Sequence, residues 1–190
     1  MEVKANKVTW PLMYKEIGND LNSLYNKINS TNKTIVSFLK ENGLEENEIT
    51  VNAPEIIDMN ADRYSSNQSN YRYNVTQVIT VASSKVDLVR RLINEQSELL
   101  KQGIAITSGD YMYRVQYEYT DLNSIKPQMI EEATKNARAA ALKFASDSDS
   151  KLGKIKRASQ GQFSITNRDE FTPYIKKVRV VTTIDYFLED

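Results

Sequence analysis

The sequence predicts an α+β fold, in which about three helices pack on an antiparallel or mixed β-sheet. Segments that alternate apolar and polar residues, which is typical of strands, occur in several parts of the 190-residue chain, and three other segments repeat apolar residues at helical spacing. Their order, β-α-β-β-α-β-α-β-β, places strands in runs and therefore disfavours a doubly wound fold. We expect residues 1–190 to form a single domain, with two subdomains as the alternative.

The first strand and the first helix have the clearest patterns. Alternation over residues 3–14 predicts a strand with one apolar face, made of Val8, Trp10, Leu12 and Tyr14. Asp20 is a suitable N-cap for an amphipathic helix of about six turns. Gly43 ends this helix, because glycine adopts the left-handed conformation at low cost.

The middle of the chain returns to strands. Residues 49–58 are predicted to form a strand in which Pro54 marks an edge or a bulge, since proline donates no backbone hydrogen bond. Residues 60–70 are the most loop-like segment, and we take them as the best candidate for a subdomain boundary or a mobile lobe. Strand character resumes over residues 71–82.

A second helix and a tyrosine-rich strand follow. We expect Ser84 to cap the helix and Gly103 to end it. The next strand is expected over residues 111–120, with Tyr111, Tyr113, Tyr117 and Tyr119 on one face. Such a row could stack bases or sugars or form a protein interface, but tyrosine is also an ordinary strand residue, and we favour that interpretation.

The last part of the chain is predicted as one helix and two strands. Pro127 suits a first helical turn. The packed face of the helix is expected to comprise Ile130, Ala133, Ala137, Ala140, Ala141, Phe144 and Ala145. Residues 147–150 and Gly153 end the helix, and strands over residues 155–165 and 177–188 close the chain.

Cysteine and histidine are absent from the sequence. Disulfides, triads that contain histidine, and zinc, iron–sulfur and blue-copper sites are therefore excluded. Glu131 and Glu132 are expected in the first turn of a helix, where acids complement the dipole. Residues 147–150 resemble a calcium loop, but Leu152 and Ala158 replace the required glycine and glutamate. We predict no catalytic residue, no metal site and no cofactor.

Charge is balanced overall but segregated along the chain. The 25 basic and 25 acidic residues give no net charge, which argues against a nucleic-acid partner. Seven acids lie between Glu41 and Asp62, and eight bases lie between Lys151 and Arg179. These segments are either solvated faces or complementary patches that orient neighbouring subunits.

A series of short stretches extends along nearly the whole chain. They are residues 8–12, 38–39 with Gly43, 102–104, 126–130, 132–141, 151–155 and 177–181. In this order they resemble the SIMPL-domain family, a group of bacterial envelope proteins of obscure function. The most specific part is the alanine-rich stretch 132–141 with the Lys-Leu-Gly sequence that follows at residue 151.

The resemblance implies an exported protein, periplasmic or otherwise extracytoplasmic, and in some members a ring-like or channel-like homo-oligomer. Family domains usually open with one more short strand, so the resemblance implies that this strand and an N-terminal signal or anchor are missing here. A membrane contact is expected only through that anchor. The family has no agreed catalytic motif and therefore provides no site residues.

We expect a non-enzymatic envelope domain of unknown cellular role, whose partner is a second copy or another envelope protein. If the two charged segments meet in a heterologous ring contact, assembly should be sensitive to salt. The alternative is a small-molecule binding module with a pocket between the helices and the sheet. A carboxylate-dependent hydrolase is the least supported function, because the sequence contains no motif for it.

Overall fold

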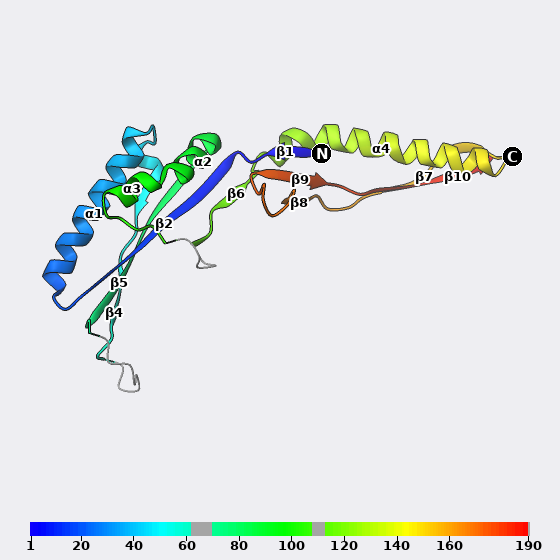
Figure 1. Ribbon diagram of the computed structural model, residues 1–190. Helices are drawn as coiled ribbons and strands as arrows, with labels where there is room; N and C mark the ends of the chain where they lie inside the picture. The colour runs from blue at the N-terminus through cyan, green and yellow to red at the C-terminus, as the bar shows by residue number, and fades with distance from the viewer. Residues whose placement is uncertain (62–69, 108–112, 190) are drawn as a thin grey trace. The chain divides into compact units, whose positions relative to one another are not determined.

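The computed structural model describes residues 1–61, 70–107 and 113–189. It divides into two compact units, of which unit 1 comprises Met1–Asn6 with Glu118–Asp190 and unit 2 comprises Lys7–Tyr117. The predicted α+β class is confirmed, because α-helices and antiparallel strand pairs both build the described chain (Figure 1).

Unit 2 is built on a five-stranded sheet. Two long strands, β2 (Lys7–Gly18) and β5 (Tyr73–Ser83), pair in antiparallel register along their full length. β3 (Ile49–Val51) and β4 (Glu55–Asp58) follow one another along the other edge of β5. The short β6 (Gln116–Glu118) lies beside β2.

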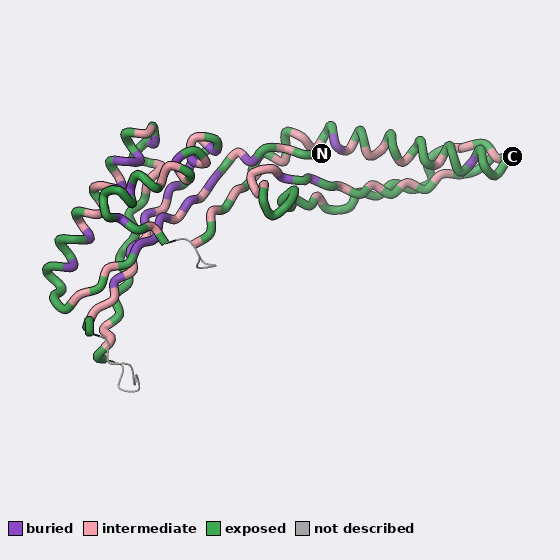
Figure 2. The backbone as a smooth tube through the Cα atoms, viewed as in Figure 1, coloured by how far each residue is buried: buried purple, intermediate pink, exposed green. Residues whose placement is uncertain are grey.

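One face of this sheet holds the main core. The predicted apolar face of β2 is confirmed, because Val8, Trp10, Leu12 and Tyr14 are all buried. Three helices accompany the sheet: α1 (Leu21–Glu41), α2 (Val86–Glu95) and α3 (Ser97–Lys101). Each contributes buried side chains, and Figure 2 shows buried residues concentrated along β2, β5 and these helices.

The first predicted helix is confirmed, whereas the second differs from its prediction. The Asp20 carboxylate accepts a hydrogen bond from the Ser23 backbone N–H at 2.7 Å, and Gly43 adopts a φ of 100° after the last turn of α1. Ser84 does not cap the second helix, because the N-cap position is Lys85. The Lys85 backbone N–H donates a hydrogen bond to the Ser83 hydroxyl oxygen at 2.9 Å. The expected single helix is two, α2 and α3, joined at Gln96.

Two boundary predictions were wrong. Residues 60–70 do not separate the units, because they connect β4 to β5, which are neighbours in one sheet; residues 62–69 of this segment lie outside the described chain. The chain instead passes between the units after Asn6 and after Tyr117. The strand expected over residues 3–14 is therefore two strands that belong to different units.

Unit 1 contains one long helix and two small antiparallel sheets. The elements are β1 (Glu2–Lys4), α4 (Leu122–Asp147), β7 (Lys151–Gln160), β8 (Ser164–Asn167), β9 (Ile175–Arg179) and β10 (Thr182–Glu189). The three-stranded sheet has the order β1-β9-β8, and β7 pairs with β10 in a two-stranded ribbon. The α4 helix packs along the ribbon (Figure 1). The two closing strands predicted from the sequence are thus four.

The start and end of α4 correct three predictions. The helix begins at Leu122, so Pro127 lies in its second turn rather than its first and removes the bond that its N–H would have made to the Asn123 carbonyl. Glu131 is consequently not in the first turn. Gly153 lies inside β7, and Asp149, with a φ of 52°, is the left-handed residue after the helix.

The alanine-rich face of α4 is only partly as predicted. Met129 and Ala145 are buried, and Ala133, Ala137 and Ala141 between them are half-buried, which gives one packed stripe at a spacing of four residues. Ala140 and Phe144 do not belong to this stripe, because both are exposed. The packed face predicted from the sequence is therefore wider than the face that α4 buries in the structure.

Candidate functional site

The acidic segment predicted from the sequence is largely paired within unit 2. The N–O distances of these ion pairs are 2.9 or 3.0 Å, and the pairs are Lys85–Glu45, Lys85–Glu48, Lys40–Glu46 and Arg72–Asp58. Asp62 lies outside the described residues. Most acids of this segment therefore have cationic neighbours in their own unit.

Glu48 occupies the centre of the largest of these networks. Its side chain is 12% exposed and accepts hydrogen bonds from the Ser83 hydroxyl at 2.6 Å and the Lys85 ammonium at 2.9 Å. Burial alone would raise the pKa of this carboxyl, but the hydrogen bonds and the nearby charge of Lys85 outweigh burial and lower the pKa. The network ties the end of β5 to the segment after α1.

Two basic residues of the segment between Lys151 and Arg179 have defined partners in unit 1. Arg168 lies 3.6 Å from a Glu2 carboxylate oxygen and 3.0 Å from one of Asp169. Lys176 is buried in β9 and donates to the Asn167 amide oxygen at 2.6 Å. Burial lowers the pKa of the Lys176 ammonium. The other six bases of this segment lie on β7 and β9, and all six are exposed.

The remaining sequence candidates do not form a reactive cluster. Glu131 forms an ion pair with Lys135 on the surface of α4. Tyr113 precedes β6, Tyr117 lies in it and Tyr119 follows it, so these three do not make the expected row along one strand; Tyr111 lies outside the described residues. In the described part of the chain, no group of three or more acidic side chains is placed to hold a metal ion.

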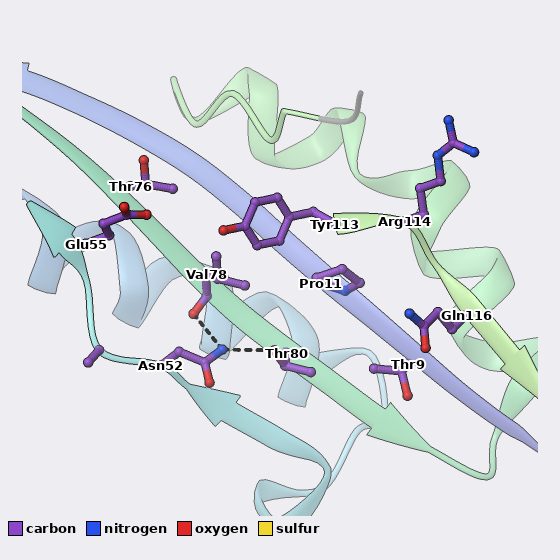
Figure 3. A pocket seen from close by; sticks show the side chains of 11 residues that line it. Thr9, Pro11, Asn52, Glu55, Thr76, Val78, Thr80, Tyr113, Arg114 and Gln116 are labelled. Carbon is purple, nitrogen blue, oxygen red and sulfur yellow. Dashed lines mark hydrogen bonds between the residues drawn. The ribbon is translucent and has the colours of Figure 1, made fainter. Parts of the chain in front are cut away.

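The face of the unit 2 sheet opposite the buried one carries a polar hollow of about 430 Å³. Figure 3 shows the Tyr113 ring extending over the sheet towards the side where Glu55 lies. The Asn52 side-chain amide donates to the Val78 carbonyl at 3.2 Å and to the Thr80 hydroxyl at 2.9 Å. Among the described lining residues Glu55 is the one carboxylate, so this hollow does not hold the carboxylate pair of a glycosidase-type hydrolase.

A second hollow lies between α1 and the sheet edge formed by β3 and β4. This groove, which we call the α1 groove, has a volume of about 450 Å³. Six of its apolar wall residues are Leu21, Leu24, Tyr25 and Ile28 of α1 with Val51 and Ile56 of the strands. None of the described lining residues is charged, and the volume is within the range of about 300–1,000 Å³ typical of ligand sites.

Gln77 of β5 is a polar residue of the α1 groove that is almost fully buried, at 1% exposure. Its amide nitrogen donates to the carbonyl oxygens of Asn52 at 2.7 Å and Val78 at 3.1 Å. Its Oε1 atom is buried without a hydrogen-bond partner among the described residues. Opposite Gln77 on β2, the buried Tyr14 hydroxyl lies 2.8 Å from the Asn32 amide oxygen, and burial raises the pKa of Tyr14.

Gln77 was not among the residues predicted for a site, although the sequence contained a usable indication. Val75, Ile79 and Val81 alternate on the inward face of β5, and Gln77 interrupts this apolar series. A polar side chain at such a position needs buried partners. The partners of Gln77 come from Asn52 and Val78, and the contact with Asn52 depends on strand pairing that alternation does not specify.

Unit 1 presents an exposed apolar end where α4 finishes, β7 begins and β10 terminates. The apolar end consists of Leu142, Phe144, Ile155, Phe187 and Leu188, all of which are exposed. Pairing of Leu188 with Leu152 and of Tyr186 with Ile155 brings the two ribbon strands together there. These residues lie on elements that are adjacent in Figure 1.

Comparisons with known proteins agree with the resemblance seen in the sequence. No helix in the described part of the chain combines the length and hydrophobicity of a membrane span. No curated protein matches the chain. A family model does match residues 1–180, across both units, and its description is SIMPL, protein of unknown function (DUF541). The chain therefore belongs to the SIMPL family.

Proposed function

We propose that this SIMPL protein is a non-enzymatic, extracytoplasmic protein that acts by assembling with further copies of itself. The observation that carries the proposal is the apolar end of unit 1, where Phe144 is 77% exposed and Leu188 is 59% exposed. Exposed apolar side chains that gather at one end of a unit favour association, because water solvates them poorly. Association would remove these side chains from water.

The β7–β10 ribbon supports the same proposal. A two-stranded ribbon depends on packing against another element for its stability in water, and here α4 supplies that packing. Each of the two strands has one edge that pairs with no strand in the described chain. A second copy could cover the ribbon face or extend it at an edge, and either contact would stabilise the elements that carry the apolar end.

Apolar association and charge pairing predict different responses to salt. A contact between the acidic segment and the basic segment should weaken as salt rises, because screening shortens the range of electrostatic attraction. Burial of the apolar end should persist or strengthen in high sulfate. Since Glu45, Glu46, Glu48 and Asp58 already have cationic partners in unit 2, we favour the apolar contact.

The test is sedimentation velocity over a concentration series at low and high salt. Wild-type protein should form a closed oligomer at both salt concentrations, and Phe144→Glu should shift the protein towards monomer. Phe171→Glu is the matched control, because Phe171 is also an exposed phenylalanine of unit 1 but does not belong to the apolar end. A wild-type monomer at every concentration would overturn the proposal, and equal loss of assembly in both variants would relocate the contact.

The extracytoplasmic location is a separate part of the proposal and needs its own measurement. Support comes from membership of the SIMPL family and from the absence of cysteine, which leaves the chain indifferent to an oxidising compartment. Fractionation of cells that produce the native gene product should recover the protein outside the cytoplasm. Recovery with cytoplasmic markers would reject this location while leaving assembly untouched.

A second candidate function is supported by a different observation. The α1 groove lies between a helix and the sheet, which is where a small-molecule binding module would have its pocket, and the buried Gln77 Oε1 atom there is unpartnered among the described residues. This binding function does not require assembly. A ligand that occupies the groove should raise the melting temperature of the monomer, because it binds the folded state alone.

A further inference from the structure

We infer that the α1 groove binds an uncharged amphipathic small molecule that carries a hydroxyl or amide N–H donor. The inference rests on the binding function proposed as the second candidate and adds the chemical class of the ligand. Three observations carry it: the apolar walls with an exposed rim, the absence of charge among the described lining residues, and the state of the Gln77 amide.

The rim of the groove consists of apolar side chains that are open to solvent. Leu21 is 45% exposed, Tyr25 66%, Val51 46% and Ile56 53%, and all four line the groove. Leu24, Ile28 and Val75, deeper in the same groove, form a buried cluster. An apolar ligand body that enters between these groups is removed from water on several sides, which is the main source of binding free energy in such sites.

The charge of the ligand follows from the lining. The described lining residues include asparagine, glutamine and tyrosine but no acid or base, in a chain of which 26% is charged. An ionised group in this groove would lose hydration without meeting an opposite charge, and that loss opposes binding. An anionic or cationic ligand is therefore disfavoured.

The hydrogen-bonding character follows from Gln77. Its amide nitrogen has both donor positions used, by the Asn52 and Val78 carbonyl oxygens. A flipped amide would place Oε1 against these two carbonyl oxygens, so the observed orientation is the one that the surroundings require. The remaining need of this side chain is a donor for Oε1. This atom is closed to water in the structure, so a ligand hydroxyl or N–H would supply the hydrogen bond after a small shift of the side chains that line the groove.

Three probes with the same apolar body test the inference. They are 4-phenylbutan-1-ol, its methyl ether, which accepts but cannot donate, and 4-phenylbutyrate, which is anionic. Two-dimensional amide NMR of the full chain would give both the affinity and the residues that respond. The alcohol should bind about fivefold more tightly than the ether, as expected for one net hydrogen bond. The shifts should be confined to α1, β3, β4 and the part of β5 around Val75 and Gln77. The carboxylate should bind more weakly than either.

The site itself is tested with neighbouring residues of β4. Ile56→Lys places a charge in the groove and should abolish binding of the alcohol, whereas Ile57→Lys is a matched control, because Ile57 is the next residue, is 47% exposed and does not line the groove. Gln77→Met should reduce the preference for the alcohol over the ether, provided that its amide spectrum shows a folded protein.

The outcomes distinguish failure of the proposed binding function from failure of the proposed ligand class. Binding of none of the probes would overturn both the binding function and the ligand class. Equal affinity for the alcohol and the ether, with binding lost in Ile56→Lys, would keep the binding function and overturn the donor requirement. Equal affinity for the carboxylate would overturn the uncharged class, and binding that survives Ile56→Lys would overturn the location.

Discussion

The two units of this SIMPL protein differ in how they bury apolar side chains. Among the described residues, nineteen buried hydrophobic residues lie in unit 2 and four lie in unit 1. Exposed large hydrophobics divide almost evenly, with nine in unit 1 and eight in unit 2. Unit 2 therefore has a core of its own, and several of its exposed apolar side chains lie at the rim of the α1 groove. Unit 1 has little core for the apolar surface that it carries, which is why we assign assembly to unit 1 and ligand binding to unit 2.

The largest expected effect tests whether the core of unit 2 dominates stability. Leu12 is 0% exposed in β2, and Leu12→Ala should lower the free energy of unfolding by about 3 kcal/mol, since the change removes buried apolar atoms and leaves a cavity. Leu142→Ala in unit 1, where the side chain is 49% exposed, should cost less than about 1 kcal/mol in the monomer. Urea titrations at a concentration that keeps the protein monomeric would measure both. Similar losses in the two variants would contradict the contrast between the units.

The next effect addresses the ribbon of unit 1. A Cβ atom at Gly153 would lie 3.0 Å from the Phe187 carbonyl oxygen and 2.8 Å from a Glu189 carboxylate oxygen. The Glu189 side chain can move away, but the backbone carbonyl belongs to β10, so Gly153→Ala should separate the strands and cost about 1–3 kcal/mol. Hydrogen exchange should show faster exchange in β7 and β10 with unit 2 unchanged.

Gly161 provides the control for this ribbon prediction. Its nearest neighbour is the Val181 carbonyl oxygen, 3.3 Å from the position of an added Cβ atom. Gly161→Ala, at the other end of the ribbon, should therefore displace the neighbouring strand less than Gly153→Ala. If Gly161→Ala destabilises as much as Gly153→Ala, close strand approach at residue 153 is not what limits the ribbon.

A smaller effect compares two asparagines, one in each unit. Asn6 accepts hydrogen bonds from the Thr120 backbone N–H at 2.9 Å and its hydroxyl at 3.1 Å, beside the points where the chain leaves and re-enters unit 1. Asn19 similarly accepts from the Arg72 N–H at 2.7 Å in unit 2. Asn6→Ala should cost about 1–2 kcal/mol, and Asn19→Ala should cost less because Asn19 is exposed and water can replace its oxygen. Calorimetry of both variants would show which of them loses more stability.

The success of the sequence predictions depended on how local the deciding interactions are. The inward face of β2, the Asp20 cap and the Gly43 stop depend on residues close in sequence, and all three are confirmed. The break after Asn6 could not be predicted, because β1 pairs with β9 and β2 pairs with β5, so the partners that divide the strand are distant in the chain.

Helix α4 and the candidate sites illustrate the same limit. Proline is common in the first turn of helices, so Pro127 was taken to mark the helix start. The helix begins five residues earlier, at Leu122. Phe144 continued the apolar spacing of α4 and was therefore assigned to the packed face, yet it is exposed. The α1 groove requires the pairing of β3 and β4 with β5, and only Gln77 marked it in the sequence.

The smallest effect separates the units by their response to acid. The folded-state pKa of the Glu48 carboxyl in unit 2 is below its ordinary value, so the unfolded state binds more protons and stability is lost as the pH falls from about 5 through the carboxylate range. In unit 1, hydrogen bonds led by the Thr172 hydroxyl, with help from Arg168, lower the pKa of Asp169 to about 2, so the turn that it holds should persist to lower pH.

Hydrogen exchange between pH 6 and 3 should therefore show loosening around Ser83 and Lys85 before the Asp169 turn. Glu48→Gln should reduce that pH dependence. Above pH 6 both units should be insensitive up to about pH 8, since the chain has no histidine. Loosening of the turn before the Glu48 network would reverse the proposed order.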